Sequence, residues 1–229
     1  MKLLLLFVTI LLTACDSSLK ESKVIDGPFL IRDGIHHFQS TNEPITGETR
    51  EFFENGQLKL STRYRDGKKN GLSETFREDG QLFRSVTYQN DYKEGLDKSY
   101  DSDGSTYFIA TYSKGKRNGA FLSYYADRSA KGNYLEDLKH GLWEVFNDQD
   151  EKIFVTNFSN GLPDGYSESY FDDILFESWE CKSGEFIEES LKKTTENKTI
   201  LDEQQRLAAE LLDEVTNRRR CNEFYMNSL

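Results

Sequence analysis

A glycine returns at the head of an alternating polar and apolar segment about every 24 residues along this chain, a period within the range of structural repeats. One aromatic residue stands five places after each of these glycines, and a second aromatic residue closes each unit. The glycines are Gly47, Gly71, Gly95, Gly119, Gly141 and Gly165, with one slightly shorter step between Gly119 and Gly141. Self-similarity at a fixed period is typical of stacked units that cannot bury their apolar faces alone. The sequence therefore predicts a repeat protein.

Each unit has the pattern of a β-hairpin. Residues 71–76 alternate with period two, the turn Glu78-Asp79-Gly80 follows, and residues 82–88 alternate again. Similar turns contain Asn55-Gly56 and Asp103-Gly104, and such pairs favour positive φ at both central residues. A second recurring loop, such as 67–71, joins one hairpin to the next. We therefore predict a mainly β fold, an elongated, curled antiparallel meander of about six hairpin repeats over residues 29–182.

The repeat pattern also resembles a known family. Phe52 to Lys59, followed by Tyr64 to Gly71, is similar to the MORN-variant repeat of the YwqK-type antitoxin family, and the likeness runs from about Gly34 to Cys181. This resemblance implies an elongated, curled β-sheet. For function it implies that the chain binds and neutralises a toxin partner.

The first fifteen residues predict export and lipidation. Lys2 precedes an apolar segment, Leu3 to Leu12, whose length suits a signal peptide and is too short to span a bilayer. The segment ends in Leu12-Thr13-Ala14-Cys15, which resembles the lipobox of bacterial lipoproteins, although an ordinary secretory signal is the alternative. We expect a signal peptide at 1–14, acylation (palmitate) at Cys15 and a lipidated tether at 15–28. Asp16 favours the periplasmic face of the inner membrane, with the outer membrane as the alternative.

The charge of the chain excludes one class of partner. Lys2 is the only charged residue in 1–14, so cleavage changes the formal net charge from -11 to -12. An acidic chain is a poor ligand for nucleic acid, because binding to phosphates depends on Lys and Arg. We therefore expect a protein partner, with the membrane contacted through the lipid anchor.

Alternation within the strands divides the side chains between two faces. The aromatic residues five places after the glycines share a face with Leu72, Leu96, Leu122 and Leu142, and we expect this face to form the core. The other face carries Ser73, Thr75, Ser99, Ser123, Ser167 and Ser169, which suit solvent. Phe121, Trp143 and Val145 interrupt that polar face, and an exposed apolar cluster can mark a contact site. We therefore predict a partner-binding patch at these three residues.

The two sets of loops differ in charge. In a meander they lie on opposite edges of the sheet, and the hairpin turns carry mostly Asp and Glu, such as Glu78 and Asp103. The joining loops carry Lys69, Lys93, Lys116, Arg117 and Lys139, which recur with the period of the glycines. A basic edge suits anionic head groups or an acidic partner. Charged turns that serve only solubility are the alternative.

The composition changes after the last hairpin. Apolar residues at helical spacing from Ile200 to Val215 predict a helix, so we expect 183–229 to form a helical cap on the final strand. Cys181 and Cys221 are the two cysteines left after lipidation, and an even pair in an exported protein favours a disulfide. Two free thiols or an intermolecular bridge are the alternatives.

Motifs that carry catalysis or bind metal are missing from the sequence. It contains no nucleophile elbow, no zinc-protease helix, no phosphate-binding glycine loop and no Cys-x-x-Cys pair. We therefore expect no enzyme, no catalytic residue, no cofactor and no metal. The leading hypothesis is a membrane-anchored immunity or antitoxin-like protein that neutralises an envelope-acting toxin. A non-catalytic envelope scaffold is the alternative, and direct contact with lipid head groups is the third.

Overall fold

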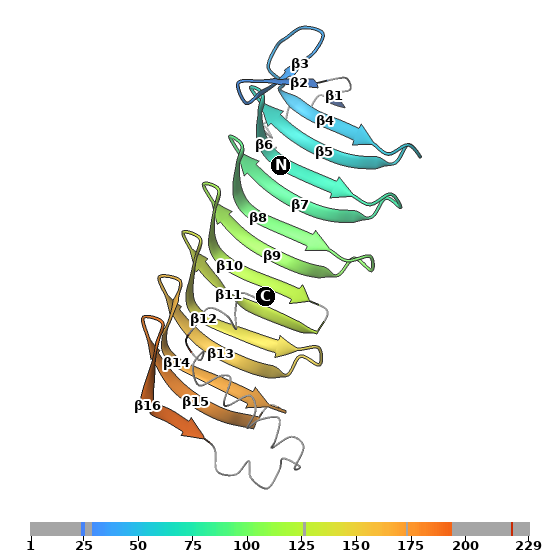
Figure 1. Ribbon diagram of the computed structural model, residues 1–229. Coiled ribbons are helices and arrows are strands. Elements are labelled where there is room, and N and C mark those ends of the chain that lie inside the picture. Colours follow the sequence, from blue (N-terminus) through green and yellow to red (C-terminus); the bar gives the residue numbers. More distant parts are fainter. Residues whose placement is uncertain (1–23, 26–28, 126, 173, 194–220, 222–229) are drawn as a thin grey trace, which may run out of the picture.

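The structure is a computed structural model that describes residues 24–25, 29–125, 127–172, 174–193 and 221. Fourteen strands form one long, curled sheet, shown in Figure 1. From β4 to β16 every strand pairs antiparallel with the next strand along the chain, and the sheet is open, with β1 at one end and β16 at the other. The predicted antiparallel meander is therefore confirmed.

The strands have the following bounds. The first part of the sheet contains β1 (Val24–Ile25), β4 (Gly47–Phe52), β5 (Leu58–Arg65), β6 (Lys68–Phe76), β7 (Leu82–Gln89), β8 (Tyr92–Tyr100) and β9 (Thr106–Ser113). The second part contains β10 (Lys116–Tyr125), β11 (Arg128–Leu135), β12 (Leu138–Asn147), β13 (Lys152–Ser159), β14 (Leu162–Phe171), β15 (Ile174–Lys182) and β16 (Glu185–Lys193). A separate two-stranded sheet contains β2 (Phe29–Arg32) and β3 (Ile35–Phe38).

Two kinds of turn alternate along the sheet. The loops that join successive hairpins are two-residue turns with positive φ at both central residues, as at Asp66-Gly67 (φ 50° and 73°) and Asn90-Asp91 (φ 50° and 69°). This is the type I′ geometry, whose twist suits antiparallel strands. We predicted that geometry for Asn55-Gly56, Asp79-Gly80 and Asp103-Gly104, and there the prediction is wrong because only the glycines have positive φ.

The turns that contain these glycines close by hydrogen bonds within a single loop. The Gly80 amide donates to the Arg77 carbonyl at 2.9 Å, and the Arg77 amide donates to the Gln81 carbonyl at 2.8 Å. The Gln81 amide also donates to the Asp79 carboxylate at 2.9 Å. The loop is therefore a type I turn followed by one left-handed residue, a position that favours glycine.

The turn before β13 keeps this geometry without a glycine, which gives a first prediction. Asp150 takes the glycine position at φ 63°, and its amide donates to the Asn147 carbonyl at 3.2 Å. Because a side chain at positive φ costs energy, Asp150→Gly should raise the free energy of unfolding by about 0.5–1 kcal/mol. Urea denaturation measures the change. Asp148→Gly in the same turn is the control, since Asp148 has no positive φ, and equal stabilisation by both variants would contradict the prediction.

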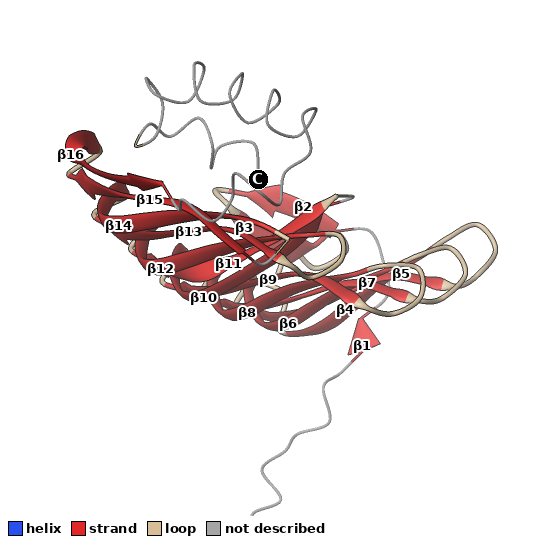
Figure 2. Ribbon diagram, turned by 90° about the horizontal axis from the view of Figure 1, so that it is seen from below, coloured by secondary structure: helices blue, strands red, loops and turns tan. Residues whose placement is uncertain are grey.

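One face of the curled sheet is concave, and we call it the inner face (Figure 2). A central row of residues crosses it from strand to strand, directly paired at every step except between β11 and β12, where a register shift separates Gly132 from Trp143. The row contains Thr62, Ser73, Val86, Asp97, Ala110, Phe121 and Gly132, and it continues through Trp143, Thr156, Ser167 and Trp179. Hydroxyl groups in the row bond across strands, with 2.9 Å between Thr62 Oγ1 and Ser73 Oγ. Most of the row is buried, so the core lies on this face.

The prediction of which face forms the core was wrong. Phe52, Leu96 and Leu142 belong to the outer, convex face and are 53%, 44% and 47% exposed. The serines expected in solvent at 73, 99, 123 and 167 are buried on the inner face. Side chains converge on the concave side of a curled sheet and bury one another there, whereas side chains on the convex side diverge and keep more contact with solvent. Alternation identified the two sets, but it carried no information on the direction of curl.

The N-terminal end of the inner face is covered by the β2–β3 hairpin (Figure 2). The His36 amide donates to the Gly67 carbonyl at 2.9 Å, and the Ile45 amide donates to the His36 carbonyl at 3.0 Å. The His36 ring also packs against Tyr64, with 4.8 Å between the ring centres. Beside it, β1 pairs parallel with β4, so part of the segment 15–28 that we expected to be a tether belongs to the sheet.

The C-terminal end differs in part from the predicted helical cap. Glu185 to Lys193 form β16, a further antiparallel strand, so the cap does not begin at residue 183 as expected. Within the described residues there is no helix, and the helix expected from Ile200 lies outside them. Cys181 on β15 is joined to Cys221 by a disulfide, as predicted, and it faces inward beside Ser167.

Candidate binding surface

Aromatic rings and cations alternate along one side of the inner face, and we call this arrangement the ladder. Its rings are Tyr64, Tyr88, Tyr112, Tyr134 and Phe158, and its cations are Lys69, Lys93, Arg117 and Lys139. Each cation stands opposite one ring in the strand pairing and extends over the next ring. The distances from the charged group to that next ring centre are 5.1 Å for Lys69, 4.5 Å for Lys93, 3.9 Å for Arg117 and 5.4 Å for Lys139. These distances are typical of cation–π interactions.

The joining turns fix the backbone of the ladder cations. The Asp91 amide donates to the Lys69 carbonyl at 3.0 Å, and the Gly115 amide donates to the Lys93 carbonyl at 2.9 Å. Asp137 and Gly161 make the equivalent bonds to Arg117 and Lys139. Each turn therefore bonds the backbone of the unit before it, and Gly67 and Gly184 make the same bond to Ile45 and Pro163. The bond fixes the position of the residue and does not require a cation there.

A buried carboxylate lies beside the ladder at the centre of the inner face. The side chain of Asp97 is fully buried, and its oxygens accept bonds from Arg84 Nε at 2.9 Å, Arg84 Nη2 at 2.7 Å and Lys93 Nζ at 2.6 Å. Burial acts to raise the pKa of Asp97, but the bonds and charges of Arg84 and Lys93 outweigh it and hold that pKa below its usual value. The same bonds raise the pKa of Arg84.

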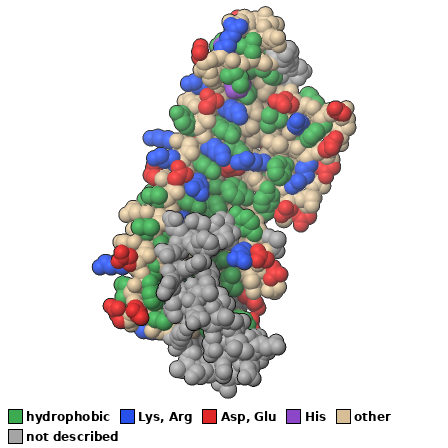
Figure 3. Space-filling view, in the orientation of Figure 1, with side chains coloured by type: hydrophobic (Ala, Val, Ile, Leu, Met, Phe, Trp, Pro, Cys, Tyr) green, Lys and Arg blue, Asp and Glu red, His purple; other side chains and the backbone are tan. Residues whose placement is uncertain are grey.

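Two cations therefore share one carboxylate in this group. The Arg84 side chain is 41% exposed and the Lys93 side chain is 27% exposed, so both can reach a ligand. Figure 3 shows Lys and Arg side chains among the hydrophobic side chains in the part of this face that the described residues form. Arg84, Lys93 and Asp97 together carry a net charge of about one positive unit, on the concave side of an acidic protein.

The structure brings four of the five predicted basic residues together and separates the fifth. Lys69, Lys93, Arg117 and Lys139 belong to the ladder, whereas Lys116 bonds Glu136 at 2.9 Å on the exposed edge. Arg117 also pairs with Asp137 at 3.2 Å. The joining edge is therefore not the basic edge we expected, because carboxylates from neighbouring turns alternate with its cations.

The predicted apolar patch is not exposed. Trp143 is 1% exposed and Val145 is 4% exposed, and both belong to a core cluster against which Phe121 packs. The Trp143 ring lies 5.4 Å from the Phe121 ring and 5.1 Å from the Tyr134 ring, measured between centres. The expected exposure of these three residues was wrong, because they lie on the inner face where side chains converge.

Sequence reasoning identified both components of the ladder but did not join them. The interval from Lys69 to Tyr88 is the same as the interval from Lys93 to Tyr112. That constant spacing was a usable signal of contact between neighbouring units. Asp97 was missed altogether, although it occupies the position at which the previous unit has Ser73, a small neutral residue.

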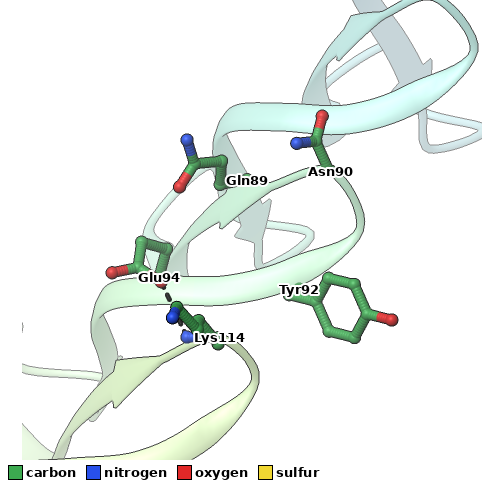
Figure 4. Close-up of a pocket in the computed structure, with 5 residues that line it drawn as sticks. All are labelled: Gln89, Asn90, Tyr92, Glu94 and Lys114. Atoms are coloured by element: carbon green, nitrogen blue, oxygen red, sulfur yellow. Dashed lines mark hydrogen bonds between the residues drawn. The ribbon is translucent and has the colours of Figure 1, made fainter.

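A shallow pocket on the joining edge is a weaker candidate site. Gln89, Asn90, Tyr92, Glu94 and Lys114 line it (Figure 4). The Glu94 carboxylate accepts a bond from the Lys114 backbone amide at 2.7 Å, so it stabilises the neighbouring turn. Among the described residues there is no cluster of three or more His, Cys, Asp or Glu side chains able to hold a metal ion. The same residues contain no helix with the length and hydropathy needed to cross a membrane.

The fold and the ladder define an open sheet built from hairpin repeats. Residues 45–66 and 69–90 match the family model described as MORN repeat variant. The matched segments begin at Ile45 and Lys69, which the structure places at equivalent positions, since both accept a bond from a joining turn. The first two units are thus similar to MORN-variant repeats, as predicted, and the later units continue their geometry. No curated protein matches the chain.

Proposed function

We propose that this chain is a lipid-anchored binding protein of the bacterial cell envelope that captures a protein partner on its inner face. The observation that carries the proposal is the ladder, which presents cations at a regular spacing along the inner face. Its rings Tyr64, Tyr88 and Tyr112 are half-buried, whereas Tyr134 and Phe158 belong to the core. Repeat proteins commonly bind partners on such extended concave surfaces. Aromatic and Arg side chains are also the residues that dominate binding energy at interfaces.

The partner that we favour is a toxin that acts in the envelope, so that the protein would serve as its immunity protein. Support for this comes from the antitoxin family that the repeats resemble and from the lipobox-like Leu12-Thr13-Ala14-Cys15. A tether at Cys15 would hold the concave face close to the membrane, where such a toxin arrives.

A scaffold in the envelope is the second candidate, and the outer face favours it. Tyr166 is 61% exposed there and Leu142 is 47% exposed. Large apolar side chains exposed on a sheet face can bind a further protein. A chain that holds two partners would use both of its faces.

The test compares the two faces in a capture experiment. Products of the genes beside this one are expressed with the full chain, and one-to-one complexes are measured together with protection of the cells. Tyr112→Ser on the ladder should weaken capture at least tenfold, a loss of about 1.4 kcal/mol. Tyr166→Ser on the outer face is the matched control and should leave capture unchanged. Cys15→Ser should release the protein from the membrane and abolish protection.

The outcomes separate the two candidates. Loss of capture in Tyr166→Ser alone would move the interface to the outer face and favour the scaffold. Absence of any one-to-one complex with a neighbouring gene product would overturn the immunity function.

A further inference from the structure

The charges on the inner face are unusual for this protein. The whole chain has a formal net charge of -11, yet the inner face from β6 to β10 carries Lys69, Arg84, Lys93 and Arg117. Arg84 and Lys93 share the carboxylate of Asp97, and Arg117 pairs with Asp137 of the neighbouring turn. Among the described residues no carboxylate lies within ion-pair distance of Lys69, whose ammonium rests on the Tyr88 ring. Electrostatic complementarity therefore selects an acidic ligand for this part of the face.

The cations are held in position before any ligand arrives. The Lys69 and Lys93 ammonium groups lie over the Tyr88 and Tyr112 rings, and the joining turns bond the backbones of both lysines. Arg84 is fixed by two bonds to Asp97. Side chains fixed in this way lose little conformational entropy on binding. A ligand with carboxylates at the matching interval gains most from such an array.

The interval follows from the strand spacing. Lys69, Lys93 and Arg117 occupy equivalent positions on β6, β8 and β10, so neighbouring cations are two strands apart. Two strand spacings are about 9.6 Å. In the polyproline II conformation a residue recurs on the same side after three positions, a rise of about 9.3 Å. An extended segment with an acidic residue at every third position therefore matches the ladder.

We propose that the inner face from β6 to β10 recognises an extended acidic segment of the partner protein, with carboxylates at every third residue meeting Lys69, Lys93 and Arg117. The segment runs along the sheet, perpendicular to the strands, and Arg84 provides a further contact beside Lys93. This inference rests on the proposed function, because it names the chemistry by which the same surface takes its partner.

The experiment uses the purified full chain in detergent and fluorescent twelve-residue peptides. The test peptide repeats Glu-Pro-Pro four times, and the spacing control has the same composition with its four glutamates adjacent. We expect the test peptide to bind more tightly than the control and to lose affinity as salt is added. Lys69→Gln should weaken binding roughly threefold to tenfold, because one carboxylate loses its partner. Lys116→Gln removes a charge from the exposed edge and should have no effect.

The outcomes distinguish this inference from the proposed function. Equal binding of the two peptides, or binding insensitive to Lys69→Gln, would overturn the acidic-segment inference. If neither peptide binds while a partner is still captured in a Tyr112-dependent manner, the inference fails and the proposed function stands. If the test peptide binds as expected and no neighbouring gene product is captured, the proposed function fails alone. Lys69-dependent binding to phosphatidylglycerol vesicles, with none to the peptide, would assign the surface to lipid and overturn the inference.

Discussion

Replacing Trp143 by alanine should lower the free energy of unfolding by about 3–5 kcal/mol, the usual cost of removing a large buried aromatic side chain. The Trp143 side chain is 1% exposed, and its ring contacts those of Phe121, Tyr134 and Phe158 at centre distances of 5.1–6.1 Å. Its Nε1 donates to the Asn133 carbonyl at 3.0 Å, so truncation also leaves a bond unmade. Urea denaturation followed by fluorescence or circular dichroism measures the loss.

Two neighbouring positions supply the controls for Trp143. Leu142→Ala alters the adjacent residue on the outer face, 47% exposed, and should cost less than about 1 kcal/mol. Gly132→Ala should destabilise the sheet, because a Cβ at Gly132 would stand 2.3 Å from the indole ring. Equal effects of Trp143→Ala and Leu142→Ala would show that the concave face is not the core.

Much of the fold could be predicted from local signals. The regular period of the glycines and the Asn55-Gly56 type of turn are properties of neighbouring residues, and they are sufficient to predict consecutive hairpins. The joining turns were harder to predict. Asn90-Asp91 and Glu136-Asp137 adopt positive φ at both residues without any glycine, and their sequences do not distinguish them from ordinary polar loops.

The inner face could not be predicted because it depends on the curl of the whole sheet. Alternation shows that Ser73 and Leu72 lie on opposite faces, but it does not show which face is concave. Once the sheet curls, Ser73 is buried and Leu96 on the other face is 44% exposed. The burial of Trp143 follows from the same cause. The direction of curl, which alternation does not contain, therefore accounts for both errors: the choice of the core face and the expected exposure of the apolar patch.

The sequence indicated the periodic basic and aromatic residues of the candidate site, but it did not show that they contact one another on the inner face. The basic residues at 69, 93, 117 and 139 were singled out by their period, but we assigned them to a loop edge that faces a partner directly. The structure shows them over aromatic rings of the inner face. Contact between Lys69 and Tyr88 crosses from one unit to the next, and alternation within a single strand cannot reveal such a contact.

The two halves of the inner face differ in their side chains. From β10 onward the central row contains Phe121, Trp143 and Trp179, whose rings fill the concave side and form buried clusters. Before β10 the row contains small residues and Asp97, which leave Arg84 and Lys93 accessible. The buried apolar clusters therefore lie toward the C-terminal half, and the binding surface that we propose lies in the N-terminal half.

Replacing the buried Asp97 by asparagine should destabilise the protein by about 3 kcal/mol at neutral pH, because Asp97→Asn removes the carboxylate that Arg84 and Lys93 share. The value is at the lower end for a broken buried ion pair, because Arg84 and Lys93 are partly exposed and keep some access to water. In the variant, two cations face each other without a carboxylate between them. Asp148→Asn, an exposed carboxylate in a hairpin turn, is the control and should change stability by less than about 0.5 kcal/mol.

The acid dependence of the same variant gives a sharper measurement, because the sign of the pKa shift fixes its direction. The pKa of Asp97 is lower in the folded protein than in the unfolded chain, so its charge contributes fully above the unfolded value of about 3.9. That contribution is lost as the pH falls through the folded pKa. The difference in unfolding free energy between wild type and Asp97→Asn should therefore be constant from pH 7 to about 5 and shrink progressively below about pH 4. Subtracting the variant removes the titration of other carboxylates, such as Glu48 and Glu144, whose pKa values are also lowered. A difference that stayed constant down to pH 2, or that grew on acidification, would mean that Asp97 is not held ionised by Arg84 and Lys93.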